Sequence, residues 1–88
     1  MWALMEGKLE IVKYLISKGA NVNARFQKFN NTTILMFASG AGNLEIVQYL
    51  IIKGSDINAR DNNGKTALME ASLEGNLEIV KYLVSQGA

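Results

Sequence analysis

The residues best suited to catalysis are two carboxylates, Glu70 and Glu74, four positions apart in a stretch expected to be helical. A pair of carboxylates hydrolyses glycosides when the two groups face each other across a substrate. Residues four positions apart on a helix are instead neighbours on one surface. The spacing therefore favours a solvated acidic patch over a catalytic pair.

Two further patterns fail for lack of key residues. Asp56, Asn58 and Asp61 suggest a calcium loop, but the D-x-[DN]-x-[DN]-G spacing and the distal glutamate are missing. The letters GKT at 64–66 end like a phosphate-binding loop, but residue 59, where that motif needs glycine, is alanine. The chain also has no histidine and no cysteine, which removes the commonest general base and two common metal ligands. We therefore expect no enzyme activity, no cofactor and no metal site.

The composition is that of one small globular domain. The chain has 88 residues, of which 49% are hydrophobic, and its nine basic and eight acidic side chains give a net charge of +1. Such a balance gives no electrostatic reason to expect binding to nucleic acid or to an anionic membrane. No apolar run approaches the roughly 20 residues that span a bilayer, and no signal peptide is visible. We therefore expect a cytoplasmic protein.

The strongest feature of the sequence is a repeat. GNLEIV occurs at 42–47 and 75–80, and GKLEIV occurs at 7–12. Leu9, Leu44 and Leu77 occupy the same position of successive copies, with spacings of 35 and 33 residues. Self-similarity at this period indicates a solenoid, in which each unit buries its apolar faces against its neighbours. A solenoid favours a binding surface over a single catalytic constellation.

Local signals predict two helices in each complete unit. In the last unit Thr66 is placed as the N-cap of a short helix over 67–74, and Gly75 supplies the left-handed turn that ends it. Asn76 then caps a second helix, LEIVKYLVS, whose apolar residues recur at helical spacing. The middle unit repeats the pattern with Thr33, a helix over 34–41, Gly42 and Asn43.

Two ion pairs are predicted within the second helices. Glu10 with Lys13 and Glu78 with Lys81 lie three positions apart. Opposite charges at this spacing stabilise a helix slightly.

The last unit, DNNGKTALMEASLEGNLEIVKYLVSQGA at 61–88, closely resembles an ankyrin repeat. TTILMFASGAGNLEIVQYLIIKGSDINAR at 32–60 and WALMEGKLEIVKYLISKGANVNAR at 2–25 resemble it too. The family's T-P-L-H tetrad reads TILM and TALM here, without proline or histidine. The resemblance implies an all-α solenoid of stacked helix-turn-helix units with hairpin-like loops, a single domain over 1–88. Its units are a truncated one at 1–25, a second at 26–60 and a third at 61–88.

The resemblance also implies a protein–protein interaction module. In ankyrin proteins the contacts fall on the tips of the hairpin loops, here called fingers, and on exposed positions of the first helices. On the fingers the matching residues are Arg25, Phe26, Gln27, Lys28, Phe29, Asn30, Asn31, Arg60, Asn62, Asn63 and Lys65. On the first helices they are Met5, Glu6, Gly40, Ala41, Leu73 and Glu74.

The finger at 23–33, here called the long finger, carries two more residues than the short finger at 58–66. It also carries Phe26 and Phe29, flanked by Arg25 and Lys28. Aromatic and basic residues are enriched at binding hot spots. One interpretation is that both rings are exposed and contact a partner. The other is that the loop folds back and buries them on its own helices.

The ends carry apolar residues where a solenoid normally has a polar cap. We expect either a fragment of a longer array or ends that pair with another copy, as a homo-dimer or an end-to-end stack. The alternative is a monomer whose end helices tilt to hide these residues: Trp2, Met5 and Leu9 at one end and Leu77, Val80 and Val84 at the other.

Three functions remain open. The first is binding of an unidentified partner protein. The second is a self-associating structural scaffold, and the third is a regulatory accessory segment of a larger protein. The tetrads and the Asn-rich loops are similar to those of microbial ankyrin proteins.

Overall fold

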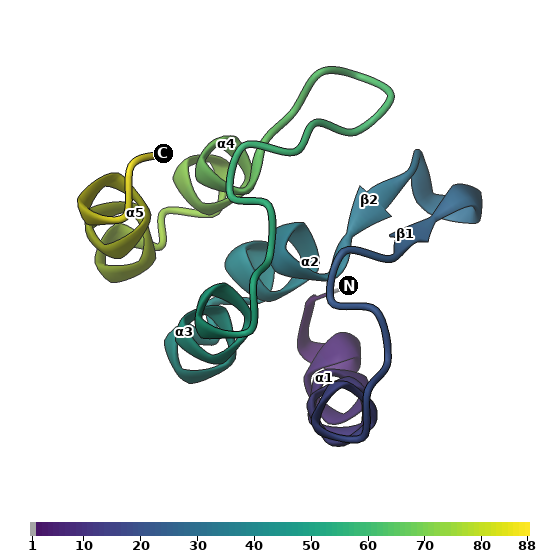
Figure 1. Ribbon diagram of the computed structural model, residues 1–88. Coiled ribbons are helices and arrows are strands. Elements are labelled where there is room, and N and C mark those ends of the chain that lie inside the picture. The colour runs from purple at the N-terminus through teal and green to yellow at the C-terminus, as the bar shows by residue number, and fades with distance from the viewer. Residues whose placement is uncertain (1) are drawn as a thin grey trace.

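The computed structural model describes the backbone of residues 2–88 and the side chains of residues 8–88. This part of the chain forms five α-helices and one small antiparallel hairpin (Figure 1). In chain order the elements are α1 (Trp2–Ser17), β1 (Arg25–Phe26), the 3-10 turn η1 (Gln27–Phe29), β2 (Thr32–Thr33), α2 (Ile34–Ala41), α3 (Leu44–Ile52), α4 (Ala67–Leu73) and α5 (Leu77–Ser85).

The middle and last units each consist of two helices joined by a tight turn. We call α2 and α4 the inner helices and α3 and α5 the outer helices. Figure 1 shows α2 at the centre of the molecule, with α1, α3 and α4 around it and α5 beyond α4. The long finger and the loop before α4 project from the helices on one side (Figure 1). The predicted all-α solenoid of stacked units is therefore confirmed.

The predicted helix boundaries follow from their capping residues. The Thr33 hydroxyl oxygen accepts a hydrogen bond from the Met36 amide, and that of Thr66 accepts one from the Met69 amide, each over 3.3 Å. These bonds satisfy an amide that has no partner within the helix. Gly42, with φ of 80°, then reverses the chain after α2, a conformation that costs other residues energy.

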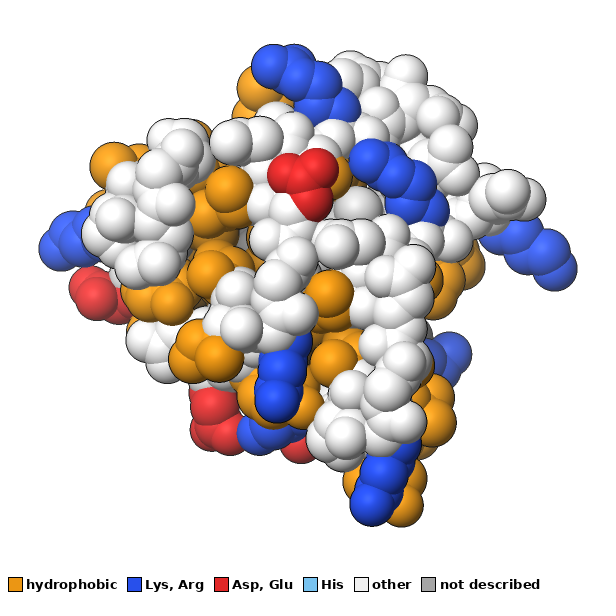
Figure 2. Space-filling model, viewed as in Figure 1, with side chains coloured by type: hydrophobic (Ala, Val, Ile, Leu, Met, Phe, Trp, Pro, Cys, Tyr) orange, Lys and Arg blue, Asp and Glu red, His pale blue; other side chains and the backbone are white. Residues whose placement is uncertain are grey.

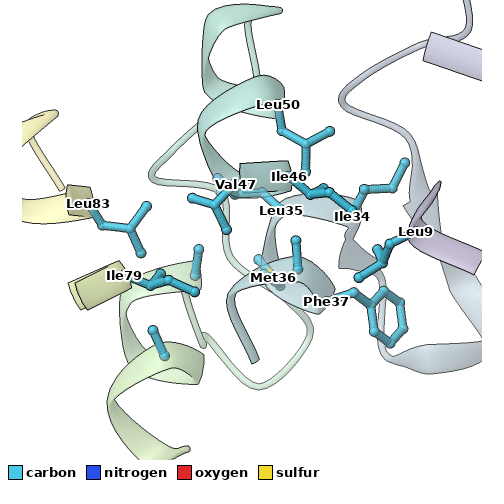
Figure 3. Packing of buried hydrophobic residues seen from close by; sticks show 14 of the residues in the cluster. Leu9, Ile34, Leu35, Met36, Phe37, Ile46, Val47, Leu50, Ile79 and Leu83 are labelled. Atoms are coloured by element: carbon cyan, nitrogen blue, oxygen red, sulfur yellow. The ribbon is translucent and has the colours of Figure 1, made fainter. Parts of the chain in front are cut away.

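The core runs through all three units and is centred on α2. Residues 34–40 are all buried, because α2 is enclosed by the neighbouring helices. Figure 3 shows the side chains of Leu9 and Phe37 on one side, those of Leu35, Ile46 and Val47 in the middle, and those of Ile79 and Leu83 on the other. The small residues Ala38, Ala67 and Ala71 are buried too, which lets α2 and α4 approach closely.

The first unit differs from the expected helix-turn-helix pattern. Residues that align with the end of an inner helix instead continue, through Gly7, into one 16-residue helix, α1. The aligned residue for a cap here is Lys8, and a lysine side chain has no acceptor. In the middle unit Asn43 does cap, since its Oδ1 accepts from the Ile46 amide at 3.1 Å. Met5 and Glu6, which the resemblance places on a first helix, therefore lie in the same continuous helix as Leu9.

The predicted capping role is also wrong for Asn76. Its side chain makes no capping bond to α5. Its Nδ2 instead donates to the carbonyl oxygens of Ser39, at 2.8 Å, and Gly40, at 3.2 Å, at the end of α2. A helix end leaves such carbonyls without partners inside the helix. Asn76 therefore links the last unit to the middle one.

One of the two predicted ion pairs is replaced by a contact between units. Lys13 Nζ lies 3.1 Å from Glu45 Oε1 of α3 and 5.2 Å from the centre of the Tyr49 ring. Lys13 thus pairs with a carboxylate of the next unit instead of with Glu10 of its own helix. The pair of Glu78 and Lys81 forms as predicted, at 3.8 Å.

Candidate functional site

The long finger is a short hairpin with a 3-10 turn at its tip. Arg25 pairs with Thr33 and Phe26 with Thr32 across β1 and β2. Its two extra residues are accommodated by η1 and by two consecutive left-handed residues, Asn30 and Asn31, with φ of 58° and 59°. Asparagine adopts this conformation more readily than most residues. The tip is thus an ordered turn.

The two phenylalanines of the long finger occupy different environments. Phe26 is half-buried against the core, and its ring meets that of Phe37 of α2 edge to face, with centroids 5.3 Å apart. Phe29 also contacts Phe37, at 5.8 Å, but 56% of it stays exposed. Edge-to-face pairs are the favoured aromatic geometry. The interpretation in which the loop folds back and buries its rings therefore holds for Phe26, whereas Phe29 keeps an aromatic surface exposed to solvent.

The two fingers lie side by side and are hydrogen-bonded to each other. The Asn62 amide donates to the Asn30 carbonyl at 2.8 Å, and the Asn31 side chain donates to that of Asn62 at 3.2 Å. Arg25 Nη1 donates to the carbonyl oxygens of Asn31, at 3.0 Å, and Arg60, at 2.7 Å. Arg25 therefore holds the fingers together, although the sequence placed it among the partner contacts.

The short finger is shaped by one carboxylate. Asp61 Oδ1 accepts hydrogen bonds from the amides of Asn63, at 2.8 Å, and Lys65, at 2.9 Å. An aspartate that accepts from its own downstream backbone is a common way to fix a turn. Asp61 therefore sets the course of the backbone at Asn63 and Lys65, which both belong to the predicted contact set.

A hollow of about 240 Å³ opens between the fingers and the inner helices. We call it the palm hollow. It brings together four predicted residues, Phe29, Asn30, Asn63 and Lys65, with four that the sequence did not single out as contacts, Thr32, Phe37, Asp61 and Glu70.

Opposite charges meet at the edge of this hollow. Lys65 Nζ lies 3.5 Å from Glu70 Oε1. Glu70 occupies the repeat position of Phe37, so both inner helices turn the same position toward the hollow. A difference between the units at this one position is the signal that would have identified both residues.

The remaining predicted contacts are scattered. Gln27 and Lys28 are exposed on η1, and Arg60 and Asn62 are exposed on the short finger. Gly40 is buried and Ala41 half-buried, so the expected exposure is wrong for Gly40. The other four lie away from the palm hollow or outside the described side chains: Leu73 and Glu74 are exposed at the end of α4, and Met5 and Glu6 lie in α1, in the part whose side chains are not described.

Charges of both signs occur on the face of the molecule that Figure 2 shows. Figure 2 shows basic and acidic side chains interspersed on this face with polar and apolar ones. The hydrogen bond to the Glu45 carboxylate raises the pKa of Lys13 above its ordinary value.

Residues 2–88 include no helix that is both long and apolar enough to cross a membrane. Among the described side chains no group of three or more acidic, histidine or cysteine residues is arranged to hold a metal ion.

Comparison with known proteins identifies the repeat. The family model for ankyrin repeats, in three copies, matches residues 1–88. A search of curated proteins finds no match.

Proposed function

The chain belongs to the ankyrin-repeat family, and we propose that it binds a partner protein across its two fingers and the palm hollow between them. Ankyrin repeats are non-catalytic modules that generally mediate protein–protein interactions. The observation that carries the proposed location is the exposed ring of Phe29 at the palm hollow. An aromatic ring beside a partly apolar hollow is typical of a binding hot spot.

The hydrogen bonds between the fingers support the same surface. They fix Asn30 and Asn62 before any partner arrives. A surface that is already ordered loses less conformational entropy on binding. The floor of the hollow is aromatic, through Phe29 and Phe37, and its edge carries amide and charged groups. A partner that inserts one apolar side chain and donates or accepts hydrogen bonds around it fits this combination.

The test uses the chain as bait for proteins of its own cell extract, with mass spectrometry to identify what is captured. Phe29→Ala should lose a captured partner, and binding of that purified partner should weaken by roughly 2 kcal/mol. Ile52→Ala is the matched control, because Ile52 is a 77% exposed apolar residue on α3, outside the residues that line the palm hollow. Circular dichroism checks that both variants keep the wild-type helix content. A partner that binds Phe29→Ala as tightly as the wild type contradicts the proposed site.

We also propose a second candidate function, self-association. It is supported by apolar side chains that α5 leaves uncovered at the last unit, among them Leu77 and Val84. Apolar surface exposed at the end of a repeat array favours contact with another apolar face.

A further inference from the structure

The outer helices expose different faces at the two ends of the array. Ile11, Ile46 and Ile79 occupy one repeat position in α1, α3 and α5. Ile46 and Ile79 are 0% and 2% exposed, whereas Ile11 is 62% exposed. The outer helices α3 and α5 each pack against an inner helix of their own unit, α2 and α4. Within residues 2–88, α1 has no such helix of its own, and this position is open.

A second repeat position shows the opposite pattern. Leu9 and Ile16 of α1 are buried, whereas Leu77 and Val84 at the same positions of α5 are exposed. These residues face the following unit, which α1 has and which α5 lacks within the described chain. The burial of Leu9 also corrects the expectation that it lies uncovered at the first end. Within the described chain, α1 thus lacks an inner helix and α5 lacks a following unit.

The open side of α1 forms a hollow of about 320 Å³ against the long finger. We call it the head slot. Its wall consists of Lys8, Ile11 and Val12 of α1 together with Phe26, Phe29 and Phe37. Five of these six side chains are apolar, and the sixth, Lys8, is an exposed cation. The head slot lies on the side where the other two units carry an inner helix.

The opposite end presents a matching apolar surface, here called the tail face. Along α4 a shallow hollow of about 440 Å³ is lined by Leu68, Met69 and Leu73, with Lys65 and Ser72. Leu73 is 68% exposed, and Leu77 and Val84 of α5 are exposed as well. The tail face thus belongs to an inner helix and an outer helix against whose far side no other element of the described chain packs.

The chain segments that build the two ends have net charges of opposite sign, although the charged residue lining each of the two hollows is a lysine, Lys8 or Lys65. Residues 1–33 contain five basic and two acidic side chains, a formal net charge of +3. Residues 61–88 contain two basic and four acidic ones, a net charge of −2. Like ends therefore repel each other, and unlike ends attract. Charge thus favours a head-to-tail contact over a symmetric one.

From these observations we infer that the head slot is a docking site for the tail face of a second copy of this chain. The inference rests on the self-association proposed above and specifies its geometry. A head-to-tail contact uses two different surfaces, so each added copy leaves one free end of each kind, and the assembly grows in one direction. Dimers, trimers and longer rods then coexist in proportions set by concentration.

The test is sedimentation velocity of the 88-residue chain from micromolar to millimolar concentration. Its mean mass should rise continuously across this range. Ile11→Glu in the head slot and Leu73→Glu in the tail face should each weaken association by roughly tenfold or more. Both side chains are more than half exposed, so these variants should fold. Ile52→Glu is the matched control and should associate like the wild type.

Mixing the two variants decides the geometry. Ile11→Glu keeps an intact tail face, and Leu73→Glu keeps an intact head slot. Together they should form a one-to-one dimer that does not grow further. A chain that stays monomeric throughout overturns self-association altogether. Association that persists in either single variant, or a mixture without the dimer, overturns the head-to-tail geometry alone. Phe29 lines both hollows, but neither Ile11 nor Leu73 lines the palm hollow, so partner capture by Ile11→Glu and Leu73→Glu separates partner binding from self-association.

Discussion

Replacing Asn76 with aspartate tests whether its side chain links two units or caps a helix. The amide of Asn76 donates to the Ser39 and Gly40 carbonyl oxygens at 2.8 and 3.2 Å. Aspartate has the same shape and is as good an N-cap as asparagine. Its charge is also favourable at the N-terminus of α5. It cannot donate a hydrogen bond, however, and it places negative oxygens beside the two carbonyls.

The expected cost follows from these contacts. Two carbonyls of the buried residues Ser39 and Gly40 at the end of α2 lose their donor. A net hydrogen bond contributes about 1 kcal/mol, with more lost when a group stays unsatisfied. With the added repulsion we expect Asn76→Asp to lower the free energy of unfolding by roughly 2–4 kcal/mol. A domain of this size is stable by only about 4–13 kcal/mol in total. Urea unfolding followed by circular dichroism at neutral pH measures the difference.

The matched control is Asn43→Asp, at the same position of the middle unit. Asn43 uses its oxygen, which accepts from the Ile46 amide at 3.1 Å. A carboxylate keeps that bond, so we expect a change within about 0.5 kcal/mol of the wild type. Below a pH of about 4 the new carboxyl at position 76 is protonated and its O–H can donate. The difference in the free energy of unfolding between the two variants should then become smaller. Equal losses at neutral pH, or a gap that widens in acid, would refute the linking role.

Three further predictions concern stability, each read from urea unfolding. Leu50→Ala should cost about 2–5 kcal/mol, because Leu50 is fully buried between the helices. Thr66→Ala should cost about 1 kcal/mol by removing the cap that the Met69 amide uses. Glu45→Gln should destabilise slightly, and this effect should fade in high salt. The hydrogen bond to Glu45 raises the pKa of Lys13 above its ordinary value. Glu45→Gln should therefore be less stable than the wild type at pH values below the ordinary lysine pKa. This difference in stability should disappear as the pH rises through the folded-state pKa of Lys13.

Much of the fold could be predicted because its signals are local. The threonine caps and the turn glycines act within a few residues, and each appears in the structure as expected. The role of Asn76 was not predictable in this way. Asn43 and Asn76 occupy the same repeat position, and only the packing of α5 beside the end of α2 turns the second side chain toward the carbonyls. The ion pair of Lys13 with Glu45 in place of Glu10 was unpredictable for the same reason, because Glu45 lies in a neighbouring unit.

The surface could be predicted only in part, because burial depends on the position of a unit in the array. Ile11 and Ile46 carry the same side chain in the same LEIV motif, yet one is exposed and the other is not. The choice between exposure and packing for Phe26 and Phe29 was open for a related reason. Both rings meet Phe37, and the course of η1 decides how much of each remains outside.

The palm hollow is where the units of this chain differ from one another. The LEIV residues common to all copies contribute mainly to packing, and interchangeable units cannot by themselves distinguish one partner from another. Phe29, by contrast, belongs to the finger that carries two extra residues, and Phe37 stands where the next unit has Glu70. All three side chains line the same hollow. A partner that contacts this hollow therefore meets an aromatic unit and a charged unit at once, at the junction between the middle and last units. Specific recognition requires such a difference, which is the physical reason to place partner binding there.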